Sequence, residues 1–171
     1  MKINHPLMHN NFAKSDMDAV RNLIKNKNLI LTQSKKVQEF EQKWSKWLKV
    51  KYSVFVNSGS SANFISMLIL KNLSKTNKKK EIIVPALTWV SDINSVIMSG
   101  FKPVFVDIDP KNLSMNLEQV KNKINKNTLA VFITHAQGFN GLSESFLKEI
   151  KRKKIILVED VCESHGASFK K

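Results

Sequence analysis

Side chains that could bind a ligand or react with it recur in this sequence directly after short apolar segments. They are Ser58 to Ser61, Thr88 and Trp89, Asp107 and Asp109, His135, and Asp160 to Glu163. In an open α/β sheet, ligands bind just beyond the carboxyl ends of the strands. If the apolar segments are parallel strands, these side chains lie along one edge of a sheet, and we expect a binding site there.

Four small residues form a turn that opens a segment with helical spacing, and they are Ser58, Gly59, Ser60 and Ser61. Gly59 lets the backbone approach a ligand closely. The free N–H groups of a helix start, together with serine hydroxyls, would suit a phosphate group. Simple N-capping by serine is the alternative. The turn matches neither glycine-rich pattern of dinucleotide-binding and P-loop proteins, so both of those sites are disfavoured.

Three more residues each have a functional and a structural interpretation. Trp89 could stack on a flat ring or belong to the core. The carboxylate of Asp160 could pair with a protonated heterocyclic nitrogen, although for an isolated Asp a turn cap is the better interpretation. For His135, a hydrogen-bonded structural role is favoured over a general base. No metal-ligand spacing links His135 with Cys162 or His165, and no metal site is expected.

The elements that must position these residues follow from the apolar pattern. Five short apolar segments predict strands, and they lie at residues 53–56, 81–84, 103–108, 129–134 and 155–159. Four segments with helical spacing lie at residues 60–73, 89–98, 117–124 and 143–153. Their alternation predicts an α/β fold with a mainly parallel sheet.

Two amphipathic segments, at residues 15–27 and 34–48, come before the first predicted strand. We therefore expect an N-terminal helical segment over residues 1–50 and an α/β domain over residues 51–171. The length of 171 residues is sufficient for one domain with a real core.

The net charge of +14 raises the alternative of a non-catalytic basic binding protein. The positive charge comes almost entirely from lysine, because Arg21 and Arg152 are the only arginines. Surfaces that read bases or grip phosphates usually use the planar arginine side chain. The lysines are also spread along the whole chain, so we expect no specific nucleic-acid partner.

Cellular location is constrained by three features of the sequence. No apolar run approaches the ~20 residues that a membrane span needs. Residues 1–8 lack the apolar stretch of a signal peptide. The single cysteine, Cys162, fits a reducing compartment. We expect a cytoplasmic protein without a membrane partner.

Taken in order, several segments share a pattern with one enzyme family. They are residues 31–33 (LTQ), 39–41 (EFE), 56–62 (VNSGSSA), 85–90 (PALTWV), 103–108 (PVFVDI) and 158–167 (VEDVCESHGA). The sequence resembles the N-terminal portion of the DegT/DnrJ/StrS family of sugar aminotransferases, which depend on pyridoxal phosphate (PLP). The resemblance covers nearly the whole chain.

The resemblance implies the fold of type I PLP enzymes, a three-layer sandwich like the large domain of aspartate aminotransferase. Residues 51–171 would be the first part of that PLP-binding domain. The cofactor phosphate would be held by Ser58, Gly59, Ser60 and Ser61. Trp89 would stack on the pyridine ring, and Asp160, the implied catalytic residue, would keep the ring nitrogen protonated. Glu163 falls where many members carry a Gln beside the phenolic oxygen of the cofactor.

The family's Schiff-base lysine is expected about 25–30 residues beyond Asp160, and it makes the covalent link to the cofactor. Lys170 and Lys171 come too soon to be assigned that role. We therefore expect a truncated chain that lacks the rest of the large domain and the C-terminal small domain. Such a fragment would be inactive, whereas the complete protein would be a homodimer.

The implied activity is transfer of an amino group, from a donor such as glutamate, to a nucleotide-linked keto-sugar. The product would serve surface-polysaccharide or deoxysugar biosynthesis. Sugar C-3 dehydration is the alternative, because some relatives carry His in place of the Schiff-base lysine. The turn at residues 57–63 and the acid at Glu163 resemble that dehydratase branch.

Overall fold

The computed structural model describes residues 10–74 and 80–169, and it divides into two compact units, Met1–Phe55 and Val56–Lys171. The predictions for residues 1–8 and for Lys170 and Lys171 lie outside the described residues. Among the helices that the structure describes, none has the length and apolar character needed to cross a membrane.

The N-terminal unit contains two helices, α1 (Lys14–Ile24) and α2 (Lys35–Leu48), which confirms the two amphipathic helices predicted there. Aromatic side chains organise the end of this unit. The rings of Phe40 and Trp44 stack with their centroids 5.7 Å apart, and Phe55 packs edge-on against Phe40 at 5.2 Å. These contacts hold the segment that follows α2 against the helix.

The strand predicted at residues 53–56 is wrong, because this segment pairs with no strand of the described chain. The backbone N–H of Phe55 donates instead to the carboxylate of Glu41 in α2, with 2.8 Å between N and Oε1. A strand forms only where a neighbouring strand completes its hydrogen bonds. A local run of apolar residues does not supply that neighbour.

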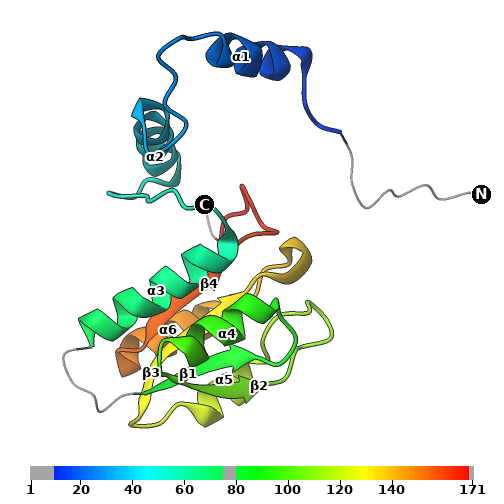
Figure 1. Cartoon of the computed structure of the whole chain (residues 1–171). Coiled ribbons are helices and arrows are strands. Elements are labelled where there is room, and N and C mark those ends of the chain that lie inside the picture. The colour runs from blue at the N-terminus through cyan, green and yellow to red at the C-terminus, as the bar shows by residue number, and fades with distance from the viewer. Residues whose placement is uncertain (1–9, 75–79, 170–171) are drawn as a thin grey trace, which may run out of the picture. The chain divides into compact units, whose positions relative to one another are not determined.

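The second unit is built on a four-stranded sheet whose neighbouring strands are all parallel. The strands are β1 (Glu81–Pro85), β2 (Lys102–Val106), β3 (Thr128–Thr134) and β4 (Ile156–Asp160), in the spatial order β2-β1-β3-β4 (Figure 1). The helices are α3 (Gly59–Leu73), α4 (Val90–Met98), α5 (Leu117–Lys123) and α6 (Glu144–Lys153). The predicted α/β fold with a mainly parallel sheet is confirmed.

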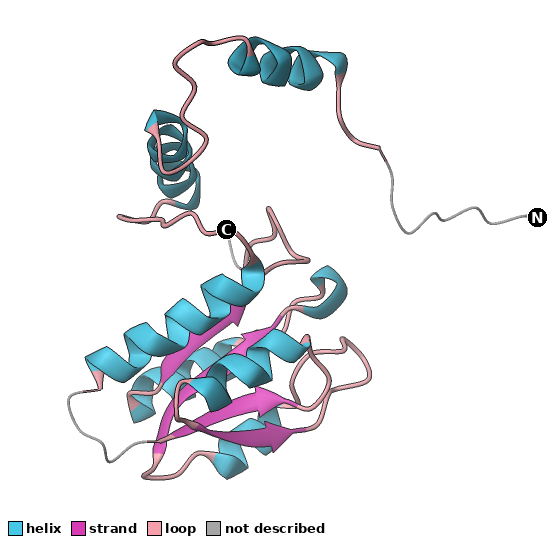
Figure 2. Ribbon diagram, in the orientation of Figure 1, coloured by secondary structure: helices cyan, strands magenta, loops and turns pink. Residues whose placement is uncertain are grey.

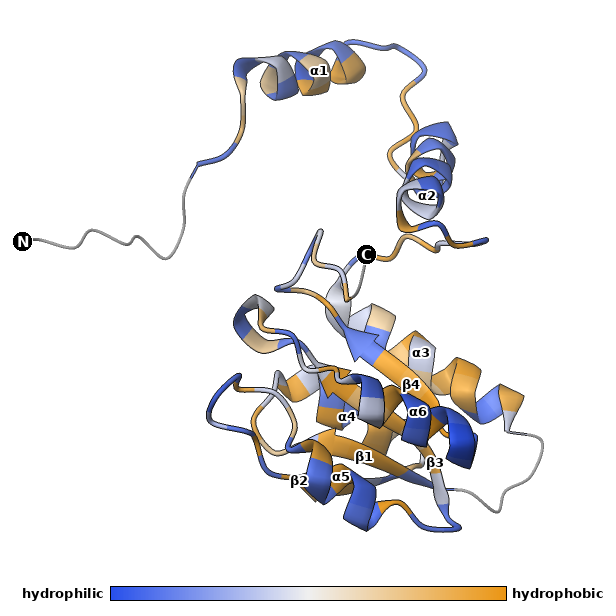
Figure 3. Cartoon of the chain, turned by 180° about the vertical axis from the view of Figure 1, so that it is seen from behind, coloured by the Kyte–Doolittle hydropathy of each residue, from blue (hydrophilic) through white to orange (hydrophobic). Residues whose placement is uncertain are grey.

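Helices cover both faces of the sheet and give the expected three layers (Figure 2). One apolar core packs α3 and α4 against one face, with Met67 and Val96 at its centre. A second core packs α5 and α6 against the other face through Val120 and Phe146. Strands β1 and β3 are hydrophobic along most of their length (Figure 3), as expected where helices cover both faces.

Successive residues of a strand point to opposite faces of the sheet. This alternation separates neighbouring side chains at the ends of β3 and β4. Thr134 and Asp160 point to the α3 and α4 layer, where they bond side chains of those helices. His135, directly after β3, and Glu159, the neighbour of Asp160 in β4, bond one another on the opposite face.

Candidate functional site

The start of α3 has the hydrogen-bond donors of an anion site. Ser58 is the N-cap, and its hydroxyl accepts the backbone N–H of Ser61 at 3.2 Å. The hydroxyl of Ser61 donates to Asn57 Oδ1 at 2.7 Å. Within the described chain, the N–H groups of Gly59 and Ser60 and the hydroxyl of Ser60 have no partner. These donors, at the positive end of a helix dipole, can bind an anion.

Asp160, at the end of β4, uses both carboxylate oxygens. Oδ1 accepts the backbone N–H of Cys162 at 2.9 Å, which is the turn cap that the structural interpretation predicted. Oδ2 accepts the side-chain amide of Asn63 at 3.0 Å. Two carboxylate oxygens offer about four lone-pair sites, so Asp160 can still accept a further N–H group.

A buried network joins this aspartate to the helix layer. The amide nitrogen of Asn63 also donates to Asp92 Oδ1 at 2.7 Å. Asp92 Oδ2 accepts the hydroxyl of Thr134 at 2.7 Å and a short hydrogen bond from the hydroxyl of Thr88. The N-terminal parts of α3 and α4 and the ends of β3 and β4 therefore meet at one place.

The environment of Asp92 changes its acidity. Burial of its carboxyl, which has no exposed surface, raises the pKa of Asp92 to about 6. The hydrogen bonds from Thr88 and Thr134 lower this pKa, and the neighbouring charge of Asp160 raises it again. Asp92 therefore titrates much closer to neutral pH than an ordinary carboxyl does.

Trp89 lies directly before α4, next to Thr88 of the network. Its side chain is 71% exposed, so the core interpretation of this tryptophan is wrong. A large aromatic side chain left in solvent beside a buried polar network is suited to stack on a flat ligand.

Glu163 connects the loops after β3 and β4. Its Oε2 accepts the backbone N–H of Gln137 at 2.6 Å, within a short 3-10 turn at Ala136–Gly138. Gly138 has a φ of 79°, and a Cβ there would lie 3.0 Å from the backbone oxygen of Glu163. The close approach of the two loops thus requires glycine at this position.

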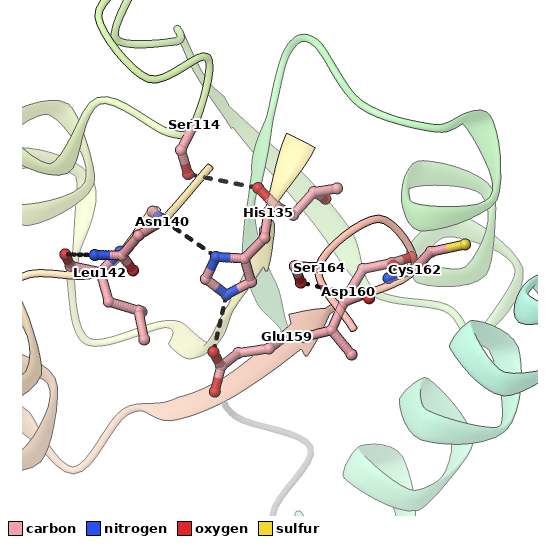
Figure 4. A network of polar contacts seen from close by, with 11 residues as sticks. Ser114, His135, Asn140, Leu142, Glu159, Asp160, Cys162 and Ser164 are labelled. Carbon is pink, nitrogen blue, oxygen red and sulfur yellow. Dashed lines mark hydrogen bonds and ion pairs between the residues drawn. The ribbon is translucent and has the colours of Figure 1, made fainter. Parts of the chain in front are cut away.

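His135 has the structural role that the sequence favoured (Figure 4). Its Nδ1 accepts the backbone N–H of Gly141 at 3.2 Å, so the ring proton is on Nε2, which lies 2.9 Å from the carboxylate of Glu159. The side chain is buried, and both ring nitrogens are in use. His135 fixes the loop after β3 and is not available as a base.

Two other acidic residues that follow a strand do not lie near Asp160 and Asp92. Asp107 and Asp109 come after β2, an edge strand that β1 and β3 separate from β4. Asp109 Oδ1 accepts the backbone N–H of Lys111 at 2.9 Å, as a turn cap does. In the described ranges, no group of three or more His, Cys, Asp or Glu side chains is arranged to hold a metal ion.

Sequence reasoning missed the connection between Asn63 and Asp92. The available signal was the one acid of a helix whose apolar face includes residues on both sides of it, Val90, Ile93 and Val96. A carboxyl on such a face needs hydrogen-bond partners in the interior. The identity of those partners depends on strand order, which brings Asp160 next to a residue 97 positions earlier.

Proteins of assigned activity match most of this chain. The GDP-4-keto-6-deoxy-D-mannose 3-dehydratase of Escherichia coli O55:H7 is 32% identical over 169 residues, which are 98% of this chain and 43% of that enzyme. The GDP-perosamine synthase of Vibrio cholerae is 31% identical over 139 residues, which are 81% of this chain and 37% of that enzyme. The chain spans less than half the length of these relatives.

Solved structures share the fold. The E. coli GDP-4-keto-6-deoxy-D-mannose-3-dehydratase with bound hydrated PLP superimposes with a TM-score of 0.88 at 32% identity, over 99% of this chain and 44% of that one. PseC of Helicobacter pylori, an aminotransferase of pseudoaminic acid biosynthesis, gives a TM-score of 0.80 at 26% identity, over 93% of this chain and 42% of that one. The pattern of one family matches residues 10–171. The chain belongs to the DegT/DnrJ/EryC1/StrS aminotransferase family.

Proposed function

We propose that the complete protein is a PLP enzyme that acts on a nucleotide-linked keto-sugar. The contact between Asn63 and Asp160 carries this proposal. It brings the anion-binding start of α3 to the carboxylate that ends β4. The shared contacts of Asp92 bring the segment with the exposed Trp89 to the same edge of the sheet. As the family resemblance implies, we propose a homodimer.

The chemistry of these groups fits PLP. The free N–H groups of Gly59 and Ser60 would bind the phosphate, because a helix start favours anions. Trp89 would provide a flat, exposed surface for the pyridine ring. Asp160 keeps lone pairs for a protonated ring nitrogen after its two structural hydrogen bonds are made.

Two serines support the proposed phosphate site from inside its loop. Ser58 caps α3, and Ser61 bonds Asn57, so hydrogen bonds within the loop at residues 57–61 support its conformation. A preformed loop loses little conformational entropy when it binds a ligand. We propose that Ser60, whose hydroxyl has no partner among the described residues, donates that hydroxyl to the phosphate.

Bound PLP supplies an electron sink for a carbanion at the substrate carbon. The task of Asp160 is to hold the proton on the ring nitrogen, since an adjacent carboxylate stabilises the cation. Asn63 and the N–H of Cys162 fix the carboxylate for this task. Glu163, held by the N–H of Gln137, would place a second acid toward the phenolic oxygen. As the resemblance implies, a Schiff-base lysine that links the cofactor covalently would correspond to a part of the relatives that this chain does not match.

Amino transfer and C-3 dehydration are two outcomes of this chemistry, and the sequence puts amino transfer from glutamate first. A specific observation supports dehydration as the second candidate. Two GDP-4-keto-6-deoxy-D-mannose 3-dehydratases match 96% and 98% of this chain, whereas three GDP-perosamine synthases match 78% to 81% of it. The acid at Glu163 supports the same branch.

Product analysis tests the proposal and separates the two chemistries. The complete protein would be incubated with PLP, glutamate and GDP-4-keto-6-deoxymannose, and the sugar would be followed by mass spectrometry. Amino transfer adds nitrogen to the sugar, whereas dehydration removes the C-3 oxygen. A protein that holds PLP but converts neither this sugar nor its thymidine-linked analogue would contradict the proposed substrate class.

A further inference from the structure

A hydrogen-bonded network of polar side chains, here called the polar chain, contacts Asp160 from the layer of α3 and α4. Its members are Asn63, Thr88, Asp92 and Thr134. Asp92 is fully buried, and Asn63 is 9% exposed. Burying a carboxyl in an apolar helix layer is costly unless its oxygens are bonded, and each oxygen of Asp92 has a bonded partner. None of these four side chains is assigned a contact with the cofactor in the function proposed above.

Asn63 connects two carboxyl groups through a single nitrogen. This nitrogen lies 2.7 Å from Asp92 Oδ1 and 3.0 Å from Asp160 Oδ2. The opposite amide orientation would aim the oxygen of Asn63 at two acids, so the observed hydrogen bonds fix the orientation. The same nitrogen also lies 3.1 Å from the hydroxyl oxygen of Ser91, but Asp92 is the nearer acceptor. The position of Oδ2 of Asp160 therefore depends first on the acceptor that Asp92 offers.

The other oxygen of Asp92 anchors the chain to two further elements. Thr134 Oγ1 lies 2.7 Å from Oδ2 and belongs to the last residue of β3, the strand next to β4. Thr88 bonds the same oxygen and directly precedes Trp89. Asp92 thus bonds both Asn63, which contacts Asp160, and Thr88, which precedes Trp89.

We infer that Asp92 is a positioning residue of the cofactor site: through Asn63 it orients the carboxylate of Asp160, and through Thr88 it holds the segment that carries Trp89. This inference rests on the proposed function. Asp92 acts through hydrogen bonds and needs no contact with cofactor or substrate. An amide at this position would meet the same demands, because its oxygen can accept from Asn63 and its N–H groups can bond the threonines.

The test compares Asp92→Ala with Asp92→Asn in the complete protein. Affinity for PLP would be measured by titration, and the state of the ring nitrogen by NMR of PLP labelled with ¹⁵N in the ring. Asp92→Ala should weaken PLP binding about tenfold, the effect of losing one hydrogen bond of ~1.4 kcal/mol. It should also change the ring-nitrogen signal. Asp92→Asn should bind PLP with an affinity within about twofold of that of wild type, because the new amide keeps the hydrogen bonds to Asn63 and to the threonines.

Two controls separate positioning from general stability. Ser95→Ala removes a buried hydroxyl that bonds the backbone oxygen of Asp92 but not the polar chain, so it should leave PLP affinity unchanged. Asn63→Ala should weaken binding as Asp92→Ala does. The double variant should be no weaker than Asp92→Ala alone, because Asp92→Ala already breaks the connection through Asn63.

Several outcomes would overturn the inference. Asp92→Ala with wild-type affinity would show that Asp160 needs no such support, and Asp92→Asn as weak as Asp92→Ala would show that charge matters and geometry does not. If Asp92→Ala does not fold, Thr88→Val serves in its place. It removes the hydroxyl through which Asp92 holds the Trp89 segment, so it should weaken PLP binding. Unchanged PLP binding by this variant would contradict the inference. A wild-type protein that binds no PLP would overturn the proposed function itself, which distinguishes the two failures.

Discussion

Asp160 shows how one carboxylate can be rigid and still open to a ligand. Its two oxygens accept N–H groups from Cys162 and Asn63, one from the following turn and one from α3. Each bond removes a rotational freedom of the side chain. The remaining lone pairs keep their direction and can meet a protonated ring nitrogen without further ordering. Rigidity of this kind is what a site that stabilises a charge requires.

We predict that Asp160→Asn lowers turnover of the complete protein. The substitution removes the charge that we propose holds the ring nitrogen protonated. It also breaks one N–H contact, because Asn offers only one oxygen to Cys162 and Asn63. Loss of a charge-assisted hydrogen bond of ~1.5–3 kcal/mol corresponds to a fall in turnover of about 10- to 150-fold.

Asp109→Asn is the matched control for this substitution. Asp109 caps its turn through the N–H two residues ahead, at 2.9 Å, as Asp160 does, but it follows the distant edge strand β2. Turnover, PLP retention and melting temperature would be measured for both variants. Equal turnover in Asp160→Asn and wild type would contradict the catalytic assignment, whatever the melting temperature.

The raised pKa of Asp92 predicts how stability depends on pH. Burial raises this pKa from 3.8 to about 6, Asp160 is the charged group that faces it, and no lysine, arginine or histidine of the described chain forms an ion pair with it. The folded state binds the proton more tightly than the unfolded chain does. The resulting stabilisation is complete below about pH 4 and is lost as the pH rises through about 6.

Asp92→Asn provides the reference for this pH dependence, because a side-chain amide does not titrate in this range. The melting temperature of wild type minus that of Asp92→Asn should therefore fall between pH 4 and pH 7. A difference that stays constant or rises with pH would contradict a raised pKa.

At the level of elements, the sequence predicted those whose cause is local. The helical spacing over residues 60–73 gave α3 to within one residue, and the β-branched run at residues 129–134 gave β3 in the same way. The strand expected at residues 53–56 failed because strand pairing is not a local property. The contact between Asn63 and Asp160 could not be predicted from the sequence for the same reason, because the order of the strands in the sheet creates it.

The loop after β3 should tolerate no side chain at Gly141. A Cβ there would overlap the hydroxyl of Ser114 and lie 2.8 Å from Ile133 Cδ1. The same glycine donates its N–H to His135, so the loop cannot move away without losing that bond. We predict that Gly141→Ala lowers the free energy of unfolding of the complete protein by about 1–3 kcal/mol, the usual cost of overpacking.

Gly59→Ala is the control for that prediction, because a Cβ at Gly59 would meet no atom within 4 Å. Denaturant unfolding of the two variants without cofactor should show a loss of stability for Gly141→Ala alone. A wild-type midpoint for Gly141→Ala would mean that the loop relaxes freely and that His135 does not fix it.

For the whole molecule, the net charge of +14 is the feature most open to another interpretation. We predict that it is incidental to function. Binding to duplex DNA at physiological salt should be no tighter than the roughly 10⁻⁴–10⁻⁶ M of non-specific contacts, and it should weaken steeply as salt is added. Fluorescence anisotropy with several unrelated duplexes would test this, and nanomolar binding to one of them would favour a basic binding protein.

Cofactor retention by the complete protein tests the central claim most directly. The protein would be loaded with PLP, freed of excess cofactor by gel filtration, and examined by visible absorption beside Trp89→Ala and Ser60→Ala. We predict that the wild type keeps a visible PLP band and that both variants retain less, because we propose that Trp89 stacks on the ring and that Ser60 binds the phosphate. A wild type without the band, or variants that retain PLP as wild type does, would contradict the claim that these residues form the cofactor site.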